Sequence, residues 1–231
     1  MSNVLITGAN RGLGLALAHA FHKEGYGLYL VVRSEAAQLE LSHAFPGANV
    51  LQCDLRDDFY ESKLKEWLTS VTLDVVINNA GSGSKAPTLA ETTAEHLHKE
   101  FETNCVAVLS TVKGCLSALQ CSRAGVVINI SSRRGSLKLQ SEMAAKGSGC
   151  SYSYRISKAA QNMLTLCLAD DLDEWGIKVI AVHPGRLLTK MASHDACMSA
   201  DESAARIVEL LRKQQFNSRD YICVENGILP W

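Results

Sequence analysis

The sequence predicts one doubly wound α/β domain over residues 1–231, a mainly parallel seven-stranded sheet with helices on both faces. The first observation behind this prediction is that short apolar runs alternate with helical patterns, which is typical of parallel sheets. The second is a glycine-rich turn directly after the first run. The third is that no linker-like tract divides the chain. The seven apolar runs lie at residues 4–6, 27–32, 50–55, 73–77, 125–130, 178–182 and 221–224.

Helical patterns fill most of the intervals between these runs. They are predicted after the glycine-rich turn and at residues 59–68, 94–119, 152–175 and 200–214. Two intervals are predicted to be loops. One is Ser82-Gly83-Ser84, and the other covers residues 133–151, which separate Ser132 from the next helix and lengthen the loop on the expected substrate side.

Composition excludes several classes of protein. Apolar residues make up 47% of the chain, enough for a sizeable core and too many for a disordered protein. The formal net charge is −1 and the basic residues are dispersed, so we expect no nucleic-acid partner and no anionic membrane surface. No apolar run is long enough to span a bilayer, and the first residues lack the features of a secretory leader.

The cysteines predict free thiols rather than disulfides. There are eight, and none forms a C-x-x-C pair. Those inside apolar runs are expected to be small buried thiols, namely Cys53, Cys105, Cys167 and Cys223. Free thiols are typical of a reducing compartment, so we expect a cytoplasmic protein. The pairs His19/His22 and His96/His98 have no further ligand at metal-binding spacing, and no metal site is predicted.

The glycine-rich turn follows the first strand and opens a helix, which is the context that a dinucleotide-binding turn requires. Gly8 permits a tight turn, Gly12 lets the backbone approach a pyrophosphate, and Gly14 lets the helix lie close to the strand. The first N–H groups of the helix would point at that anion. A glycine-rich turn alone is often only a turn, but its place at the first strand of an alternating chain favours dinucleotide binding.

Two arginines favour NADP over NAD as the dinucleotide. An acidic residue about 20 residues beyond the glycines would bind the ribose 2′-OH of NAD, whereas an arginine accommodates the 2′-phosphate of NADP. The second strand ends at Arg33 with no acid beside it, and Arg11 lies inside the glycine-rich turn. Either arginine alone is equally well explained as a solvated surface charge.

Tyr154 and Lys158 are four residues apart at the start of a predicted helix and therefore lie on one helical face. A cation near a phenol favours the phenolate and lowers its pKa from about 10, which suits proton transfer to or from an alcohol oxygen. Such pairs also occur by chance on surface helices. Tyr152 is a competing tyrosine, but it is not four residues before the lysine.

Four motifs together resemble one family. They are T-G-x-x-x-G-x-G at residues 7–14, N-N-A-G at 78–81, the serine pair at 131–132 and Y-x-x-x-K at 154–158. The sequence resembles the short-chain dehydrogenase/reductase family over essentially its full length. With its ending L-P-W, it is most similar to the carbonyl reductase, sniffer and C-factor-like branch. The resemblance implies a Rossmann-type fold that binds a nicotinamide dinucleotide.

The resemblance also implies roles for particular residues. Tyr154 would donate a proton to a carbonyl oxygen that Ser132 binds, Lys158 would hold the nicotinamide ribose, and Asn104 would lie at a helix kink and support a proton relay. The residues that match the family's cofactor contacts are Gly8, Asn10, Arg11, Gly12, Leu13, Gly14, Arg33, Asp54, Leu55, Asn79, Ala80, Gly81, Tyr154, Lys158, Pro184, Gly185, Leu187 and Thr189.

Several alternatives stay open. Asp54 is either an adenine-pocket residue or a cap for the helix predicted at 59–68. Arg186 lies at a position where the family often has an apolar or aromatic residue. We therefore expect it to affect the substrate. The helices that carry Asn104 and Tyr154 often form the family's homodimer interface, so a homodimer is expected too.

We expect NADPH-dependent reduction of a small-molecule aldehyde, ketone or quinone. The alternative is a dinucleotide-binding regulatory or signalling protein with marginal turnover.

Overall fold

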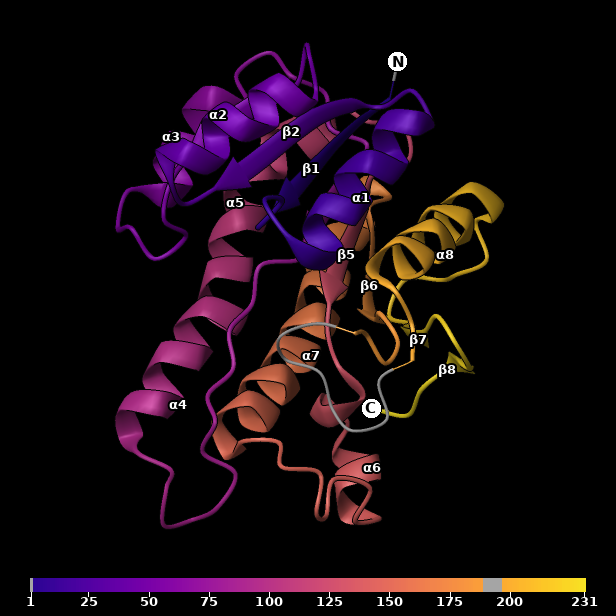
Figure 1. Ribbon diagram of the computed structural model, residues 1–231. Helices are drawn as coiled ribbons and strands as arrows, with labels where there is room; N and C mark the ends of the chain where they lie inside the picture. Colours follow the sequence, from indigo (N-terminus) through magenta and orange to yellow (C-terminus); the bar gives the residue numbers. More distant parts are fainter. Residues whose placement is uncertain (1, 189–196) are drawn as a thin grey trace.

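The computed structural model describes residues 2–188 and 197–231, and its centre is one eight-stranded sheet (Figure 1). The strand order is β3-β2-β1-β4-β5-β6-β7-β8, and every pair from β1 to β7 is parallel. The parallel seven-stranded core is therefore confirmed, and the short antiparallel β8 is an addition that was not predicted. The strands are β1 (Asn3–Thr7), β2 (Gly27–Val32), β3 (Asn49–Gln52), β4 (Val75–Asn78), β5 (Val126–Ile130), β6 (Lys178–His183), β7 (Tyr221–Cys223) and β8 (Gly227–Ile228).

Helices cover both faces of the sheet because alternate strand residues point to opposite sides. Val4 and Ile6 of β1 belong to one core cluster, with α1, α2 and α8, whereas Leu5 belongs to a second cluster with α3, α5 and α7. Each face therefore has its own buried apolar layer. The helices are α1 (Gly12–Lys23), α2 (Glu35–Ala44), α3 (Tyr60–Trp67), α4 (Ala94–Phe101), α5 (Ala107–Gln120), α6 (Leu137–Ser141), α7 (Tyr152–Leu172) and α8 (Ala200–Lys213).

The helix predicted at 94–119 is interrupted. A π-helical turn, η1 (Glu102–Val106), separates α4 from α5 and contains the buried Asn104. The kink that the family resemblance implied at this residue is confirmed in position. Below the sheet in Figure 1, α4 lies beside α7, so η1 faces the helix that carries Tyr154.

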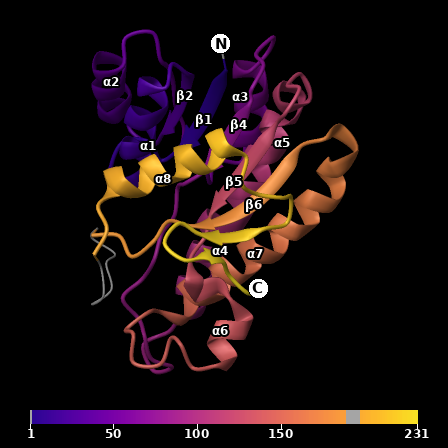
Figure 2. The ribbon, with the colours of Figure 1, turned by 90° about the vertical axis from the view of Figure 1, so that its right-hand side faces the viewer.

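The segment at 133–151 is more ordered than a loop. It contains the 3₁₀ turn η2 (Arg133–Gly135) and the short helix α6. The chain end folds back against it, because the Ser136 hydroxyl donates to the Pro230 carbonyl at 2.6 Å and the Lys138 amide donates to Trp231 at 3.0 Å. Figure 2 shows this return of the C-terminal segment to α6.

All eight cysteines are free, as predicted, but one burial prediction is wrong. Cys53, Cys105 and Cys223 are buried, whereas Cys167 is exposed. An apolar run on a helix still has an outward face, and Cys167 lies on that face of α7 between Leu166 and the buried Leu168. Within residues 2–188 and 197–231, every helix is too short or too polar to cross a membrane.

Candidate active site

Helix α7 begins at Tyr152 and is capped by Ser151, whose hydroxyl accepts the Tyr154 amide at 3.3 Å. Tyr154 and Lys158 then face the same side, and the Lys158 ammonium lies 5.8 Å from the centre of the tyrosine ring. Tyr152 instead lies under the Arg155 guanidinium, 4.8 Å from its ring centre, on a different side of the helix. The structure thus places Tyr154, not Tyr152, beside the lysine.

Ser132 reaches the same place from the end of β5. Its hydroxyl accepts the Arg134 amide at 3.2 Å and begins the turn η2. It also lies within hydrogen-bonding reach of the Tyr154 phenol, and this contact lowers the pKa of that phenol. Behind it, the Tyr221 phenol donates to the Ser132 carbonyl. A strand end and a helix therefore bring the serine and tyrosine side chains together, as predicted.

Burial is the largest influence on the pKa values of Tyr154 and Lys158. It raises the pKa of Tyr154 to about 12, against the effect of Ser132 and helped by Cys150, Tyr221 and Glu100. The sequence predicted the opposite direction, on the assumption that the Lys158 charge would outweigh other effects. That prediction is wrong for the protein without a bound cofactor. Burial also lowers the pKa of Lys158 to about 7, so at neutral pH only part of the lysine population is charged.

Lys158 is 3% exposed and has two polar partners. Its Nζ donates to the Ile130 carbonyl at 2.8 Å and to Gln161 Oε1 at 2.9 Å. A Cβ added at Gly81 would lie 3.8 Å from this Nζ, so the N-N-A-G turn passes directly over the lysine. The ammonium is therefore held between the end of β5 and the turn after β4.

Asn104 links three segments of the site. Its Nδ2 donates to the Ser82 carbonyl and to the Ser157 hydroxyl, each at 2.9 Å, and its Oδ1 accepts the Ser82 amide at 2.9 Å. The carboxamide of η1 thus fixes the turn after β4 to α7, one residue before Lys158. This is an architectural use of Asn104 in addition to the relay that the resemblance implied.

The glycine-rich turn has the geometry that its spacing predicted. Gly8 and Gly12 have φ of +67° and +53°, which side chains rarely adopt. A Cβ at Gly12 would meet no atom within 4 Å, so its backbone is open to a ligand. A Cβ at Gly14 would overlap the Gly8 carbonyl and lie 2.6 Å from Asn79 Nδ2. Around these glycines, Asn10 and Arg11 are exposed and Leu13 is buried.

The N-N-A-G turn is tied to the glycine-rich turn. The Thr7 hydroxyl accepts the amides of Asn79 and Ala80, both at 3.1 Å, and Asn79 Nδ2 donates to the Thr7 carbonyl at 2.9 Å. Asn78 spans to the next strand, where its Nδ2 donates to Asn129 Oδ1 at 2.8 Å. These amides brace neighbouring strands.

Beyond the end of β2 lies a cation, Arg56, that the sequence reasoning missed. Arg56 forms a 3.0 Å ion pair with Asp54, whose pKa is lowered by this hydrogen bond and further by Arg33. Arg33 is exposed at the end of β2, and Leu55 is only partly buried. The alternative that Asp54 caps the helix at 59–68 is wrong, because the N-cap residue of α3 is Phe59, which has no side-chain cap, and the Asp54 carboxylate accepts the Arg56 amide at 3.0 Å instead.

The loop after β6 matches the family loop that contacts the nicotinamide. Gly185 has φ +87°, and the Pro184 carbonyl accepts the Ser203 hydroxyl at 2.6 Å. Leu187 pairs with Met198 as an isolated bridge. Thr189 lies outside the described residues.

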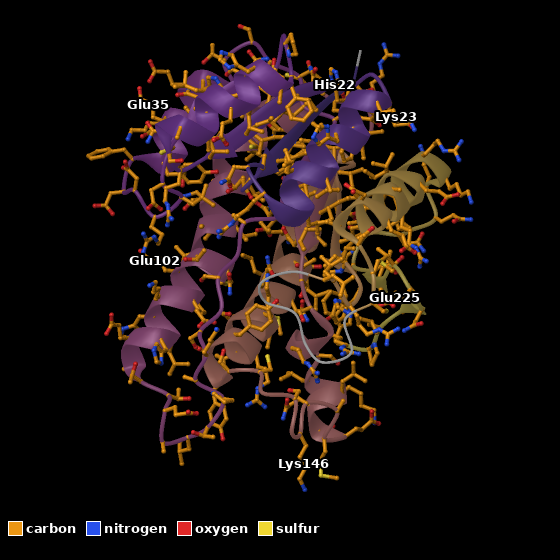
Figure 3. All side chains as sticks on the ribbon, viewed as in Figure 1. His22, Lys23, Glu35, Glu102, Lys146 and Glu225 are labelled. Atoms are coloured by element: carbon orange, nitrogen blue, oxygen red, sulfur yellow. The ribbon has the colours of Figure 1, made fainter. Side chains whose placement is uncertain are left out.

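Arg186 is held by Glu225, with an ion pair of 3.0 Å and an amide–carboxylate hydrogen bond of 3.0 Å. Figure 3 shows Glu225 on the same side of the molecule as β7. Together with His183 and Cys223, this carboxylate forms a group whose ligand atoms lie within 4.8 Å of one another. The arginine beside Glu225 opposes a second cation there, so the group is better explained as part of the ion pair.

A cavity of about 400 Å³ lies between η2, α6 and the ends of β6 and β7, and neither Ser132 nor Tyr154 is among its lining residues. Its polar lining includes Arg133, Arg134, Gln140 and Asn226, with Leu139 among its apolar lining residues. No sequence motif marked this space, since it forms only when the segment at 133–151 meets the C-terminal strands.

The chain matches a sequence model of the short chain dehydrogenase family over residues 2–199. It is 31% identical to L-fucose dehydrogenase of Oryctolagus cuniculus over 204 residues, which are 87% of this chain and 68% of the relative. It is also 31% identical to the C-signal protein of Myxococcus xanthus over 162 residues, 69% of this chain and 93% of that one. The chain therefore belongs to the short-chain dehydrogenase family.

Solved structures agree over the whole chain. The carbonyl reductase Sniffer of D. melanogaster superposes with a TM-score of 0.87 at 28% identity, covering 100% of both chains. A carbonyl reductase from Pseudomonas aeruginosa PAO1 in complex with NADP gives a TM-score of 0.81 at 30% identity, again over 100% of both. The protein is thus an oxidoreductase of this family with a Rossmann-type fold, and its cofactor is a nicotinamide dinucleotide.

Proposed function

We propose that the protein reduces a carbonyl group of a small molecule, in an aldehyde, ketone or quinone, to an alcohol with NADPH. The observation that carries this proposal is the meeting of Ser132, Tyr154 and Lys158 beside the turn at Gly81. A protein that only binds a dinucleotide has no need of a serine hydroxyl against the tyrosine phenol. The likeness to carbonyl reductases supports the same reaction.

The residues present fit the cofactor. The open backbone at Gly12 and the start of α1 suit a pyrophosphate, and the Asn79–Gly81 turn offers small residues near Lys158. When bound, NADPH supplies the hydride.

Each catalytic side chain has a distinct task. With its pKa near 12, Tyr154 is protonated at neutral pH and can donate to the carbonyl oxygen. Ser132 donates a hydrogen bond to the same oxygen and stabilises the negative charge that develops there. Lys158, with a pKa near 7, can pass a proton toward Tyr154 after the transfer, while Asn104 holds the surrounding segments in place.

NADPH rather than NADH is supported by the cluster of cations at the end of β2. Arg33 is exposed there, Arg56 lies nearby on Asp54, and Arg11 is exposed in the glycine-rich turn. The position after β2 where an acidic residue would bind the ribose 2′-OH of NAD is occupied by Arg33. Guanidinium groups are suited to a 2′-phosphate because they bind phosphate oxygens in pairs.

The test is NADPH oxidation against a panel of aldehydes, ketones and quinones, with Tyr154→Phe as the matched control. We expect turnover by the wild type and a loss of about a thousandfold or more in the variant, with NADPH affinity unchanged. Tight NADPH binding without oxidation by any carbonyl compound would reject the proposal. A parallel assay with NADP and L-fucose measures the reverse direction, which the rabbit relative's name suggests.

A regulatory or signalling protein with marginal turnover is the second candidate. The likeness to C-signal favours it. It predicts tight dinucleotide binding and a biological effect that Tyr154→Phe does not abolish.

A homodimer is part of the proposed function. Phe101, Val106 and Leu109 on α4–α5 and Ile156 and Met163 on α7 are between 40% and 59% exposed. They form apolar stripes on the helices that the family resemblance assigns to a dimer interface. The free thiols support a place in the cytoplasm.

A further inference from the structure

The loop at Ser82-Gly83-Ser84 is held by two side chains that are four residues apart, Glu100 on α4 and Asn104 on the adjoining η1. Asn104 binds both polar backbone atoms of Ser82, as described above. Glu100 Oε1 accepts the Ser84 amide at 2.5 Å. The two acceptors are four residues apart along the helical segment, and the two amides are two residues apart along the loop. Four helical residues and two extended residues cover similar distances, so each acceptor lies opposite one amide.

The same two side chains also reach α7, again at positions four residues apart. Asn104 donates to the Ser157 hydroxyl, and the Ser153 hydroxyl donates to Glu100 Oε1 at 2.9 Å. The Ser84 and Ser153 hydroxyls lie 3.1 Å apart. The site therefore has two cross-links that join the loop to α7. Asn104 makes the first, through Ser157, the residue before Lys158. Glu100 makes the second, through Ser153, the residue before Tyr154.

Glu100 is an unusual residue for this place. It is only 2% exposed, and its Oε2 is buried without a hydrogen-bond partner among the described residues. No salt bridge to it occurs within residues 2–188 and 197–231. Burying a carboxylate without a cation is costly, whereas glutamine could accept the same hydrogen bonds. A carboxylate here therefore needs a reason beyond packing.

The geometry points to Glu100 as a positioning residue for Tyr154: it fixes the first turn of α7 against the loop after β4 and places a negative charge behind the tyrosine. This inference rests on the proposed reductase function. It names a role for a residue that lies outside the glycine-rich, serine, tyrosine–lysine and asparagine motifs.

The charge has a direction that suits reduction. Burial is the largest cause of the raised pKa of Tyr154, and Glu100 adds a smaller effect in the same direction, which disfavours the phenolate. The other titratable groups around Tyr154 are Cys150 before α7, Tyr221 on β7 and Lys158 on α7 itself. Cys150 and Tyr221 are neutral at pH 7, because burial raises the pKa of each, so Glu100 and Lys158 are the charges to vary.

Glu100→Gln removes the charge and keeps an oxygen for Ser84 and Ser153. We expect the basic limb of the kcat/KM profile for NADPH-dependent reduction to move to lower pH by about 0.5–1 unit. Glu100→Ala removes the cross-link as well, and we expect kcat to fall about 10- to 100-fold with little change in the KM for NADPH. Glu100→Asp should restore part of the charge effect.

Glu102→Gln is the matched control, since it makes the same charge change two residues away on the exposed side of the helix, where Figure 3 labels it. It should shift neither the profile nor kcat. A Glu100→Gln enzyme with the wild-type profile and kcat overturns the inference, even if its thermal stability changes. If Glu100→Gln does not fold, Ser153→Ala removes the α7 half of the cross-link, and an unchanged kcat in that variant also overturns it.

A second readout separates this inference from the proposed function. The ¹³C NMR shift of the Tyr154 Cζ carbon, assigned with Tyr154→Phe, follows the phenol without any turnover. If the wild type does not oxidise NADPH, the proposed function fails, yet Glu100→Gln is still expected to lower the pH at which this carbon titrates. An unchanged titration in an active or inactive enzyme counts against the role of Glu100.

Discussion

Lys158→Met should stabilise the fold at low pH while abolishing the reductase reaction. Burial lowers the pKa of Lys158 from 10.5 to about 7, so the folded state holds this proton less tightly than the unfolded state does. At a pH below both values, this difference destabilises the folded protein by roughly 5 kcal/mol. Methionine has similar length and no charge, and the variant therefore avoids that cost.

The gain is offset by lost hydrogen bonds. Lys158 donates to the Ile130 carbonyl and to Gln161 Oε1, and leaving these two buried acceptors without a donor costs about 1–2 kcal/mol each. The net expectation at about pH 6 is a stabilisation of roughly 2 kcal/mol. Near pH 10 the wild-type lysine is neutral in the folded state, so only the loss of hydrogen bonds remains, and the variant should be less stable by about 3 kcal/mol.

The sign of the pH effect follows from proton binding. Between about pH 7 and about pH 10.5 the unfolded state binds the Lys158 proton and the folded state does not, so the free energy of unfolding of the wild type rises with pH. Urea unfolding of both proteins at several pH values across this window measures the difference. A difference that does not vary with pH, or a variant that is less stable at every pH, would refute the reasoning about a buried ammonium.

Three further outcomes are expected. Gly14→Ala places a Cβ against backbone and should abolish NADPH binding and cost about 3 kcal/mol in urea unfolding, whereas Gly12→Ala, with open space, should cost only about 1 kcal/mol for its left-handed backbone. Arg33→Ala should weaken NADPH binding about tenfold and leave NADH binding unchanged in fluorescence titrations, and equal weakening of both would count against a 2′-phosphate contact. Met163→Asp should convert a dimer to a monomer in sedimentation velocity, and a wild type that is monomeric from the outset would remove the dimer proposal.

The parts of the fold that follow from local patterns could be predicted from the sequence. The parallel strands and the glycine-rich turn depend on runs of neighbouring residues, and so they appeared where the patterns placed them. Tyr154 and Lys158 were predictable for the same reason, because helical spacing alone puts them on one face. The strand end pointed to the pair Ser131 and Ser132, because such sheets bind ligands there, and the family resemblance singled out Ser132.

The features that were missed or predicted wrongly depend on contacts between distant segments. In the sequence, Glu100 is one charged residue in a polar helical segment. Only the fold places the loop after β4 and α7 against it. The contact of Arg186 with Glu225, 39 residues away, could not be predicted from the sequence either, and the effect of Arg186 on the substrate stays a prediction. The pKa of Tyr154 was predicted from one neighbour, whereas burial by the whole site decides its direction. Cys167 was assigned from the composition of a run, which does not say which face of a helix a residue occupies.

The central claim is that Ser132, Tyr154 and Lys158 surround a carbonyl group at the moment of hydride transfer. Its most direct test is to supply NADPH that carries deuterium at the reactive carbon of the nicotinamide, together with a carbonyl compound, and to locate the label in the product by mass spectrometry. With deuterium at both hydrogen positions of that carbon, the predicted result is deuterium on the alcohol carbon with the wild type and about a thousandfold less labelled alcohol per unit time with Tyr154→Phe. Deuterium that stays on the nicotinamide for every carbonyl compound, in a protein that binds NADPH tightly, would contradict the account.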